Sequence, residues 1–308
     1  MGHFVLKVDR LRTKRVLIAA AMLLAGLASG CARQVPAPTA EAKTRAVIDD
    51  LGRAVQIPEK VDRVISLAPN LTEIVFAVGG GPKLVGVTTF CNYPPEAQSI
   101  RKVSDTLTPN IESIVALRPQ IVFVSTASQL ETFTKILDEQ NITVFVTGPN
   151  SLDGIYRSIA TVGDILGTRE RAAGVVRDMR NRVARVQEST GEGAHPKVFV
   201  QIDKNSLYTI GKDSFITDII ARAGGVSATA DLATAYPKLS KETALALNPE
   251  VIILSESDDN REPNEVFGNS PAVKNKRVYS VNADLLSRPG PRIVDALEQI
   301  ADRLREQK

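Results

Sequence analysis

The sequence predicts an α/β protein with two lobes, each built on a mainly parallel sheet, joined by one long rigid helix. Three observations support this prediction. Short β-branched and apolar runs alternate with helical segments, one long helical stretch separates two series of such runs, and parts of the first series recur in the second. Uninterrupted apolar runs of this kind are typical of strands buried on both faces of a parallel sheet.

The first thirty residues are typical of a targeting segment. Basic residues precede a mostly apolar stretch from Val16 to Ala28, and Ser29-Gly30-Cys31 follows it. Such a stretch is too short to cross the ~30 Å hydrocarbon layer of a membrane as a helix. We therefore expect residues 1–30 to be a signal peptide that is removed in front of Cys31.

Removal of this segment changes the charge of the protein. The full chain has 38 Lys+Arg and 35 Asp+Glu, a net charge of +3. The first thirty residues hold five bases and one acid, which leaves 33 bases and 34 acids in the rest of the chain. A net charge of about −1 gives no indication of nucleic-acid binding.

Residues 31–44 are rich in Pro, Ala and polar residues and predict a flexible tether. Ordered structure is expected from Arg45 onward. Two short apolar runs, 46–48 and 54–57, flank an Asp/Gly-containing turn and predict a β-hairpin.

Two series of predicted strands follow the hairpin. We expect an N-terminal lobe over residues 45–165 and a C-terminal lobe over residues 191–308. The predicted strands are, in the first lobe, 64–67, 84–87, 121–124 and 142–146, and in the second, 198–200, 251–254 and 278–281.

A long helix is predicted between the two series, from Thr168 to Ser189, within an interlobe segment 166–190. Its apolar residues recur at spacings of three and four, which places them on one face: Ala172, Val176, Met179, Val183 and Val186. A helix this long could join two lobes. Periodicity alone also allows an ordinary surface helix of a single domain.

An internal repeat favours the two-lobe interpretation. Residues 110–125 match residues 240–255 at an offset of 130, each with a capping residue, an apolar helix, a proline and a strand. A second, weaker match pairs residues 71–80 with residues 216–225.

The search for catalytic chemistry is mostly negative. The sequence has no HExxH, CxxC, GxSxG or P-loop motif. His195 is expected in an exposed loop, and Cys91 as a single half-buried packing thiol. Residues 79–83 superficially resemble a phosphate loop, but they follow a helix and are better explained as its C-cap and turn. We expect neither a catalytic residue nor a bound metal or cofactor, although a surface-anchored enzyme and a structural lipoprotein remain alternatives.

Several motifs resemble the periplasmic binding proteins that serve ABC importers of iron-siderophores, haem and cobalamin. The resemblance extends from about Arg45 to the C-terminus, and it implies two α/β lobes, a rigid interlobe helix and a ligand in the cleft between the lobes. The segments that carry it are 48–53, 63–73, 85–88 and 92–97.

The residues before Cys31 resemble the lipobox of bacterial lipoproteins. This resemblance implies that the Cys31 side chain carries a diacylglycerol, that the chain carries fatty acids such as palmitate, and that it is anchored to a membrane. The protein would then be exported, on the periplasmic or cell-surface side.

Within the family, the members that bind cobalamin, a corrinoid, are the most similar. Their cleft loops resemble segments that contain six candidate ligand-binding residues: Phe90, Tyr93, Tyr208, Tyr236, Asp284 and Arg288. The resemblance implies that Phe90, Tyr208 and Tyr236 are aromatic walls against the corrin, and that the last two residues contact its amides.

Two positions depart from the cobalamin pattern. Thr106 and Ser125 stand where tryptophans are expected, and the chain contains no Trp. A ferric siderophore or haem therefore remains an alternative ligand, and ordinary core packing remains an alternative role for each aromatic residue.

The resemblance also implies one docking carboxylate per lobe for arginines of a permease dimer, at Glu112 and Glu242. These two residues are related by the offset of 130. Each lies two residues after an expected N-cap, so stabilisation of the helix dipole is the structural alternative. Glu73 is interpreted as structural, in a capping box that begins at Asn70.

Overall fold

The computed structural model describes residues 1–3, 43–105, 110–126, 130–140, 142–190 and 195–306. Most of the predicted signal peptide, Cys31 and nearly all of the tether lie outside the described residues. Within the described part of the chain, no helix combines the length and the apolar character needed to span a membrane. Residues Lys43–Lys308 form one unit by their contacts, and the description below concerns this unit.

The N-terminal lobe is built on a five-stranded sheet whose strands are all parallel. All four strands predicted in this lobe are present. The additional edge strand, Lys102–Ser104, was not predicted because only its central Val103 is buried. In sheet order the strands are β5 (Lys102–Ser104), β4 (Leu84–Thr88), β3 (Val64–Ser66), β6 (Ile121–Ser125) and β7 (Thr143–Thr147).

The C-terminal lobe contains a second parallel sheet, of four strands. The three predicted strands are confirmed, and a two-residue edge strand joins them. In sheet order these are β11 (Val278–Asn282), β10 (Val251–Glu256), β8 (Lys197–Gln201) and β9 (Val226–Ser227).

The predicted hairpin precedes the first sheet. β1 (Thr44–Ile48) pairs antiparallel with β2 (Ala54–Pro58), and the Asp49 carboxylate accepts hydrogen bonds from the Arg53 backbone and guanidinium across the turn. The hairpin joins the sheet at β7, where the Asp50 N–H donates to the Val146 carbonyl over 3.1 Å.

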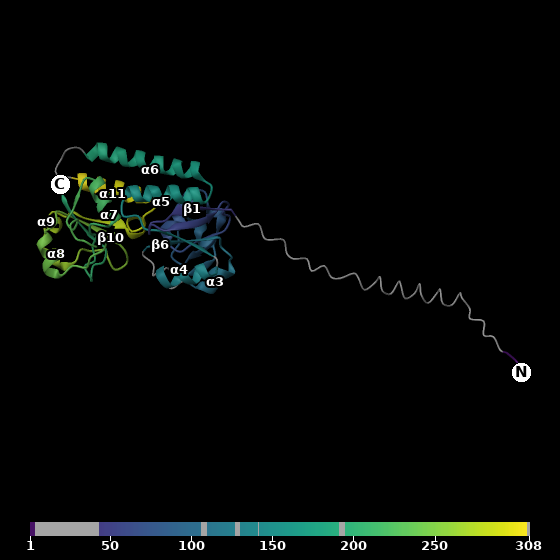
Figure 1. The fold of residues 1–308 in the computed structure, drawn as a ribbon. Coiled ribbons are helices and arrows are strands. Elements are labelled where there is room, and N and C mark those ends of the chain that lie inside the picture. Colours follow the sequence, from purple (N-terminus) through teal and green to yellow (C-terminus); the bar gives the residue numbers. More distant parts are fainter. Residues whose placement is uncertain (4–42, 106–109, 127–129, 141, 191–194, 307–308) are drawn as a thin grey trace. The chain divides into compact units, whose positions relative to one another are not determined.

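One layer of helices covers both sheets on the side of α6, as Figure 1 shows. Their buried side chains form a single apolar cluster with buried residues of both sheets. The helices of this layer are α2 (Pro69–Ala77), α5 (Leu152–Ile165), α6 (Arg169–Thr190), α7 (Phe215–Arg222) and α11 (Ile293–Arg305).

The predicted long helix is confirmed as α6, whose 22 residues begin and end within one residue of the predicted bounds. Four residues of its predicted apolar face are buried, and Val176 is partly buried. The helix packs on α2 and α5 from the first lobe and on α7 and α11 from the second. It is therefore shared by the two lobes and is not an ordinary surface helix of a single domain.

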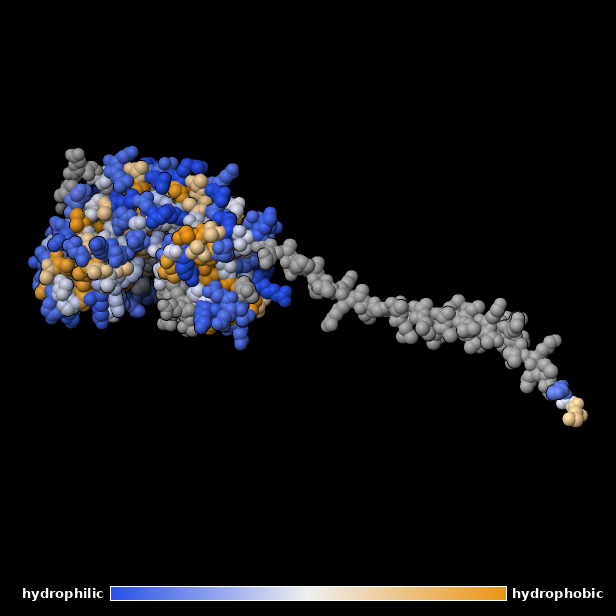
Figure 2. All heavy atoms as spheres, in the orientation of Figure 1, coloured by the Kyte–Doolittle hydropathy of each residue, from blue (hydrophilic) through white to orange (hydrophobic). Residues whose placement is uncertain are grey.

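The other face of each sheet has its own apolar cluster. Figure 2 shows an outer surface on which hydrophilic residues interrupt the apolar groups. The remaining helices are α3 (Ile111–Ala116), α4 (Leu130–Glu139), α8 (Lys241–Leu247), α9 (Pro271–Lys274), α10 (Ala283–Leu286) and the short turns Gly81–Lys83, Pro95–Ser99 and Glu265–Phe267.

The internal repeat is visible in the backbone. The Asn110 side chain caps α3 by accepting from the Ser113 N–H over 2.9 Å, and Ser240 caps α8 through the Thr243 N–H over 3.1 Å. After each helix, one residue has a positive φ before the proline, 47° at Arg118 and 42° at Asn248.

The second sequence match, of residues 71–80 with residues 216–225, is also visible in the backbone. Gly79 follows α2 with φ +83°, and Gly224 follows α7 with φ +92°. Residues 79–83 are thus the C-cap and turn that were predicted, and the Lys83 ammonium donates to the Val61 and Leu166 carbonyls instead of facing a phosphate site.

The positive φ at Arg118 generates a prediction about stability. A non-glycine residue in the left-handed region costs about 1–2 kcal/mol, and the Arg118 side chain is exposed. Arg118→Gly should therefore raise the free energy of unfolding by about 0.5–1 kcal/mol and the melting temperature by about 1–4 °C.

Asn248→Gly is the matched control in the second lobe. Asparagine tolerates this backbone conformation better than arginine, so its replacement should change the melting temperature less. A calorimetric scan in which Arg118→Gly melts at or below the unmodified protein would contradict the assignment of strain to this position.

Candidate ligand-binding site

A cavity of about 510 Å³ lies between the two lobes. The segments that line it follow β3, β4, β6 and β7 in the first lobe and β8, β9 and β11 in the second. The carboxyl ends of parallel strands are the usual place for ligands in open α/β sheets. The lining residues are Ala68, Pro69, Asn70, Phe90, Ser125, Thr126, Gly148, Pro149, Asn150, Asp213, Phe215, Ala235, Tyr236, Asp284, Ser287, Arg288 and Pro289.

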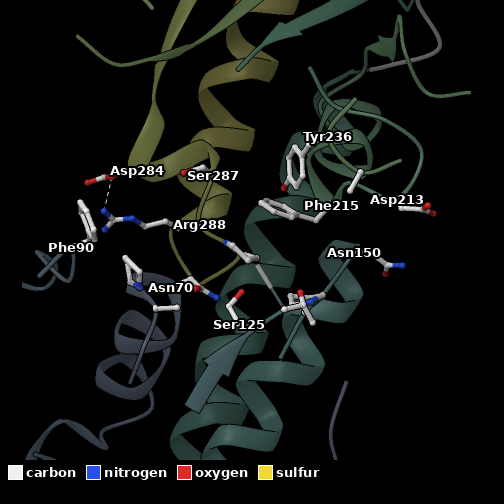
Figure 3. A pocket seen from close by; sticks show the side chains of 17 residues that line it. Asn70, Phe90, Ser125, Asn150, Asp213, Phe215, Tyr236, Asp284, Ser287 and Arg288 are labelled. Atoms are coloured by element: carbon white, nitrogen blue, oxygen red, sulfur yellow. Dashed lines mark ion pairs between the residues drawn. The ribbon is translucent and has the colours of Figure 1, made fainter. Parts of the chain in front are cut away.

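Aromatic side chains line the cavity at two places, as Figure 3 shows. Phe90 is 56% exposed and lies on the side of Asp284 and Arg288. Tyr236 lies beside Phe215 on the other side, and 46% of Tyr236 is exposed. Desolvation inside the cleft raises the pKa of the Tyr236 phenol, and its hydrogen bond with the Ser214 side chain opposes this shift. These rings offer flat apolar surfaces to a ligand.

Uncharged polar groups occupy much of the remaining lining. Asn70 and Asn150 contribute carboxamides from the first lobe, and Ser287 contributes a hydroxyl from the second. Ser125 lies at the end of β6, at one of the positions where cobalamin binders were expected to have tryptophan. A cavity with this lining suits a ligand that combines a large apolar face with hydrogen-bonding groups at its edge.

A network of charged groups joins the two lobes beside the cavity. The Arg288 guanidinium lies 2.9 Å from the Glu73 carboxylate and 2.5 Å from the Asp284 carboxylate. Arg292 also donates to Glu73, over 2.6 and 2.9 Å. The Asn92 amide donates to Asp284 over 2.9 Å and accepts from Arg288 over 2.7 Å. Glu73 is only 2% exposed at its side chain, so two arginines of the C-terminal lobe surround one buried carboxylate of the N-terminal lobe.

The predicted capping box at Asn70–Glu73 is wrong. The N-cap of α2 is Ala68, which makes no side-chain hydrogen bond to the helix, and Pro69 is the first residue of the helix. Proline is favoured there because its missing N–H would have no helical partner. The Glu73 carboxylate is thus free to bind the arginines of the other lobe.

Four of the six predicted ligand residues line the cavity: Phe90, Tyr236, Asp284 and Arg288. Tyr93 and Tyr208 are absent from the lining. The Tyr93 ring lies 3.8 Å from the Arg292 guanidinium carbon in a separate hollow, and the Tyr208 backbone bridges to Asp203 and Lys238. Thr106 lies outside the described residues.

Several lining residues were not predicted. Asn150 lies three residues after β7 and Asn70 four residues after β3. The rule that parallel strands end at one sheet edge was therefore a signal that could have found both. Phe215 is the first residue of α7, Asp213 lies in the loop before it, and Ser287 directly follows α10. Their approach to the cavity depends on the packing of the second lobe, and no local pattern in the sequence indicates it.

Cys91 and His195 lie outside the cavity. Cys91 is fully buried rather than half-buried, with its sulfur 3.1 Å from the Thr72 hydroxyl and 3.2 Å from the Thr88 hydroxyl. His195 is exposed, as expected, and its Nδ1 lies 2.9 Å from the Gly224 carbonyl. In the part of the chain that the structure describes, no three His, Cys, Asp or Glu side chains are grouped so that they could hold a metal ion.

The two predicted docking carboxylates are exposed. Glu112 lies in the first turn of α3 and Glu242 in the first turn of α8, and both helices lie on the side of the molecule away from α6 in Figure 1. Hydrogen bonds from its own backbone and from Ser240 lower the pKa of Glu242. Both side chains are therefore available to a partner.

Comparison with known proteins is consistent with this architecture. A family model described as periplasmic binding protein matches residues 64–285. An ABC transporter substrate-binding lipoprotein of Bacillus subtilis is 31% identical over 94% of this chain and 96% of its own length. A vitamin B12-binding protein of Vibrio cholerae is 30% identical over 80% of this chain and 91% of its own length. The crystal structure of a periplasmic vitamin B12 binding protein of Vibrio cholerae superposes with a TM-score of 0.70 at 29% identity, covering 81% of this chain and all of that chain.

Proposed function

The chain belongs to the periplasmic binding protein family, and from this membership we propose that it captures cobalamin or a related corrinoid outside the cytoplasmic membrane and delivers it to an ABC importer. The observation that carries the choice of ligand is the cavity between the lobes, with aromatic rings at two places and uncharged polar groups between them. The protein acts by binding, without altering its ligand.

The chemistry of a corrinoid matches this lining. Its macrocycle is a broad, nearly flat apolar surface, and its rim carries many carboxamides. Rings such as Phe90 and Tyr236 bury area against the macrocycle, while Asn70 and Asn150 exchange hydrogen bonds with the rim. The similarity to the sequence and to the crystal structure of vitamin B12-binding proteins of Vibrio cholerae supports the same choice.

A corrinoid is larger than the cavity and would extend beyond its lining. Tyr93 and Tyr208, each 43% exposed, are then available to parts of the ligand outside the lining. We keep both as proposed ligand contacts on this ground.

The ligand is tested by calorimetric titration of a soluble form of the protein, beginning at Ala32, with cyanocobalamin, haem and a ferric siderophore. Cyanocobalamin should bind with one site per molecule. Tyr236→Ala should weaken this binding about tenfold or more, because the ring contributes only where both surfaces leave water.

Tyr236→Phe is the matched control, since it keeps the ring and removes only the hydroxyl. We expect its affinity to stay within about threefold of the unmodified protein. Tight binding of haem or of the siderophore without binding of cyanocobalamin would overturn the choice of ligand.

Delivery is proposed to depend on Glu112 and Glu242. One carboxylate per lobe, on equivalent helices, provides two contact points for arginines of a permease dimer. Exposed ion pairs are worth only about 0.2–1 kcal/mol each, which suits a carrier that binds and leaves, and their larger effect is on orientation and encounter rate.

The double reversal Glu112→Arg and Glu242→Arg should abolish corrinoid uptake by cells, and each single reversal should reduce it. Affinity of the isolated variants for the ligand should remain within about threefold, because neither residue lines the cavity. Normal uptake by the double variant would leave these carboxylates with only a stabilising role at their helix starts.

Lipid anchoring at Cys31, after removal of residues 1–30, is proposed from the lipobox resemblance and from the relative named as a lipoprotein. Residues 31–44 would then tether the lobes, whose proposed extents are 45–165 and 191–308 on either side of the segment 166–190.

Cys31→Ser should abolish incorporation of a labelled fatty acid, because the serine hydroxyl does not replace the acylated thiol. Labelling is followed in cells that express the full-length chain. A Cys31→Ser protein that still takes up the label would show that acylation occurs elsewhere.

A further inference from the structure

Arg288 is the only cationic side chain among the described residues that line the cavity. Two carboxylates already bind its guanidinium. Asp284, which also lines the cavity, lies 2.5 Å from it, and Glu73, which lies behind the lining, is 2.9 Å from it. Asp213 adds a further carboxylate to the lining. An anionic group of a ligand would therefore meet a cation that is already neutralised.

Glu73 determines both the position and the charge of this cation. It comes from α2 of the first lobe, whereas Arg288 and Arg292 come from the segment between α10 and α11 of the second. The side chain of Arg288 is 10% exposed, and its guanidinium also donates to the Asn92 amide over 2.7 Å. With partners on both lobes, Arg288 is held at the edge of the cavity and has little freedom to turn toward a ligand.

We propose that Glu73 is a selectivity residue, which holds Arg288 across the lobes and cancels its charge, so that the cavity accepts a neutral carboxamide-rich corrinoid and disfavours one that carries a carboxylate. This inference rests on the proposed function. Glu73 acts through Arg288 and does not itself touch the ligand, so it is a positioning residue.

The physical basis is the energy between charges in a partly desolvated cleft. With Glu73 in place, the group formed by Glu73, Arg288, Arg292 and Asp284 has no net formal charge. Glu73→Gln removes one negative charge and leaves the group with a net positive charge at the cavity edge. At the effective dielectric of such sites, one unit charge several ångströms away changes the affinity for an anion by about tenfold or more, while a neutral ligand is little affected.

The test compares two ligands that differ by one charge. They are cyanocobalamin and its monocarboxylic acid, in which one side-chain amide is hydrolysed to a carboxylate. Both are titrated calorimetrically at pH 7 into the soluble form that begins at Ala32, which contains the whole unit Lys43–Lys308. The unmodified protein should prefer the amide, and Glu73→Gln should shift the ratio of the two affinities toward the carboxylate by about tenfold or more.

Glu298→Gln is the matched control. It also removes a carboxylate that binds an arginine, Arg182 at 2.6 Å, between α6 and α11, but neither residue lines the cavity. Its affinity ratio should equal that of the unmodified protein.

A second variant keeps the test decisive if Glu73→Gln does not fold, as judged by its circular dichroism melt. Asp284→Asn removes the other carboxylate of Arg288 at a side chain that is 41% exposed, and it should shift the ratio in the same direction. If a variant folds and its ratio of the two affinities is unchanged, the inference is overturned while the proposed function stands. Failure of the unmodified protein to bind either ligand overturns the proposed function, and the inference with it.

Discussion

The two lobes share one apolar core, and the site depends on this constraint. Buried side chains of α2, α5, α6, α7 and α11 form a single cluster with residues of both sheets. Burial of apolar surface is the main stabilising term in folding, so separating the lobes would expose much of this cluster to water. The carboxyl ends of the two sheets are consequently held on either side of the cavity.

Hydrogen bonds and ion pairs between the lobes add directional contacts to this apolar packing. The Asp218 carboxylate of α7 accepts from the Leu152 N–H at the start of α5, and Glu73 binds Arg288 and Arg292. Breaking a buried ion pair by removing one partner costs about 3–5 kcal/mol, although a well-packed apolar replacement of both can be neutral or stabilising. Stability alone therefore does not explain why charges occupy this position, whereas control of the charge beside the cavity does.

The sequence predicted most of the architecture because its signals are local. Apolar runs indicated seven strands, the spacing of Ala172, Met179 and Val183 indicated α6, and the repeat indicated two similar lobes. The two edge strands escaped prediction since each is short and has only one buried residue, whereas the three residues of β3 are all buried. Glu73 was misinterpreted because its partners lie more than two hundred positions away, and Asn70 ahead of it satisfied a local capping pattern. The place of Phe215 at the cavity arises from the packing of α7 within the second lobe, which no local pattern in the sequence indicates.

The central claim is that a corrinoid occupies the cavity between the lobes, and cobalt allows its position to be measured directly. Crystals of the soluble form from Ala32, grown with cyanocobalamin, would be exposed to X-rays on either side of the cobalt absorption edge. An anomalous difference peak between Phe90 and Tyr236, one per molecule, is the predicted result. A peak elsewhere on the protein, or an unoccupied cavity in crystals that contain cobalt, would contradict the account.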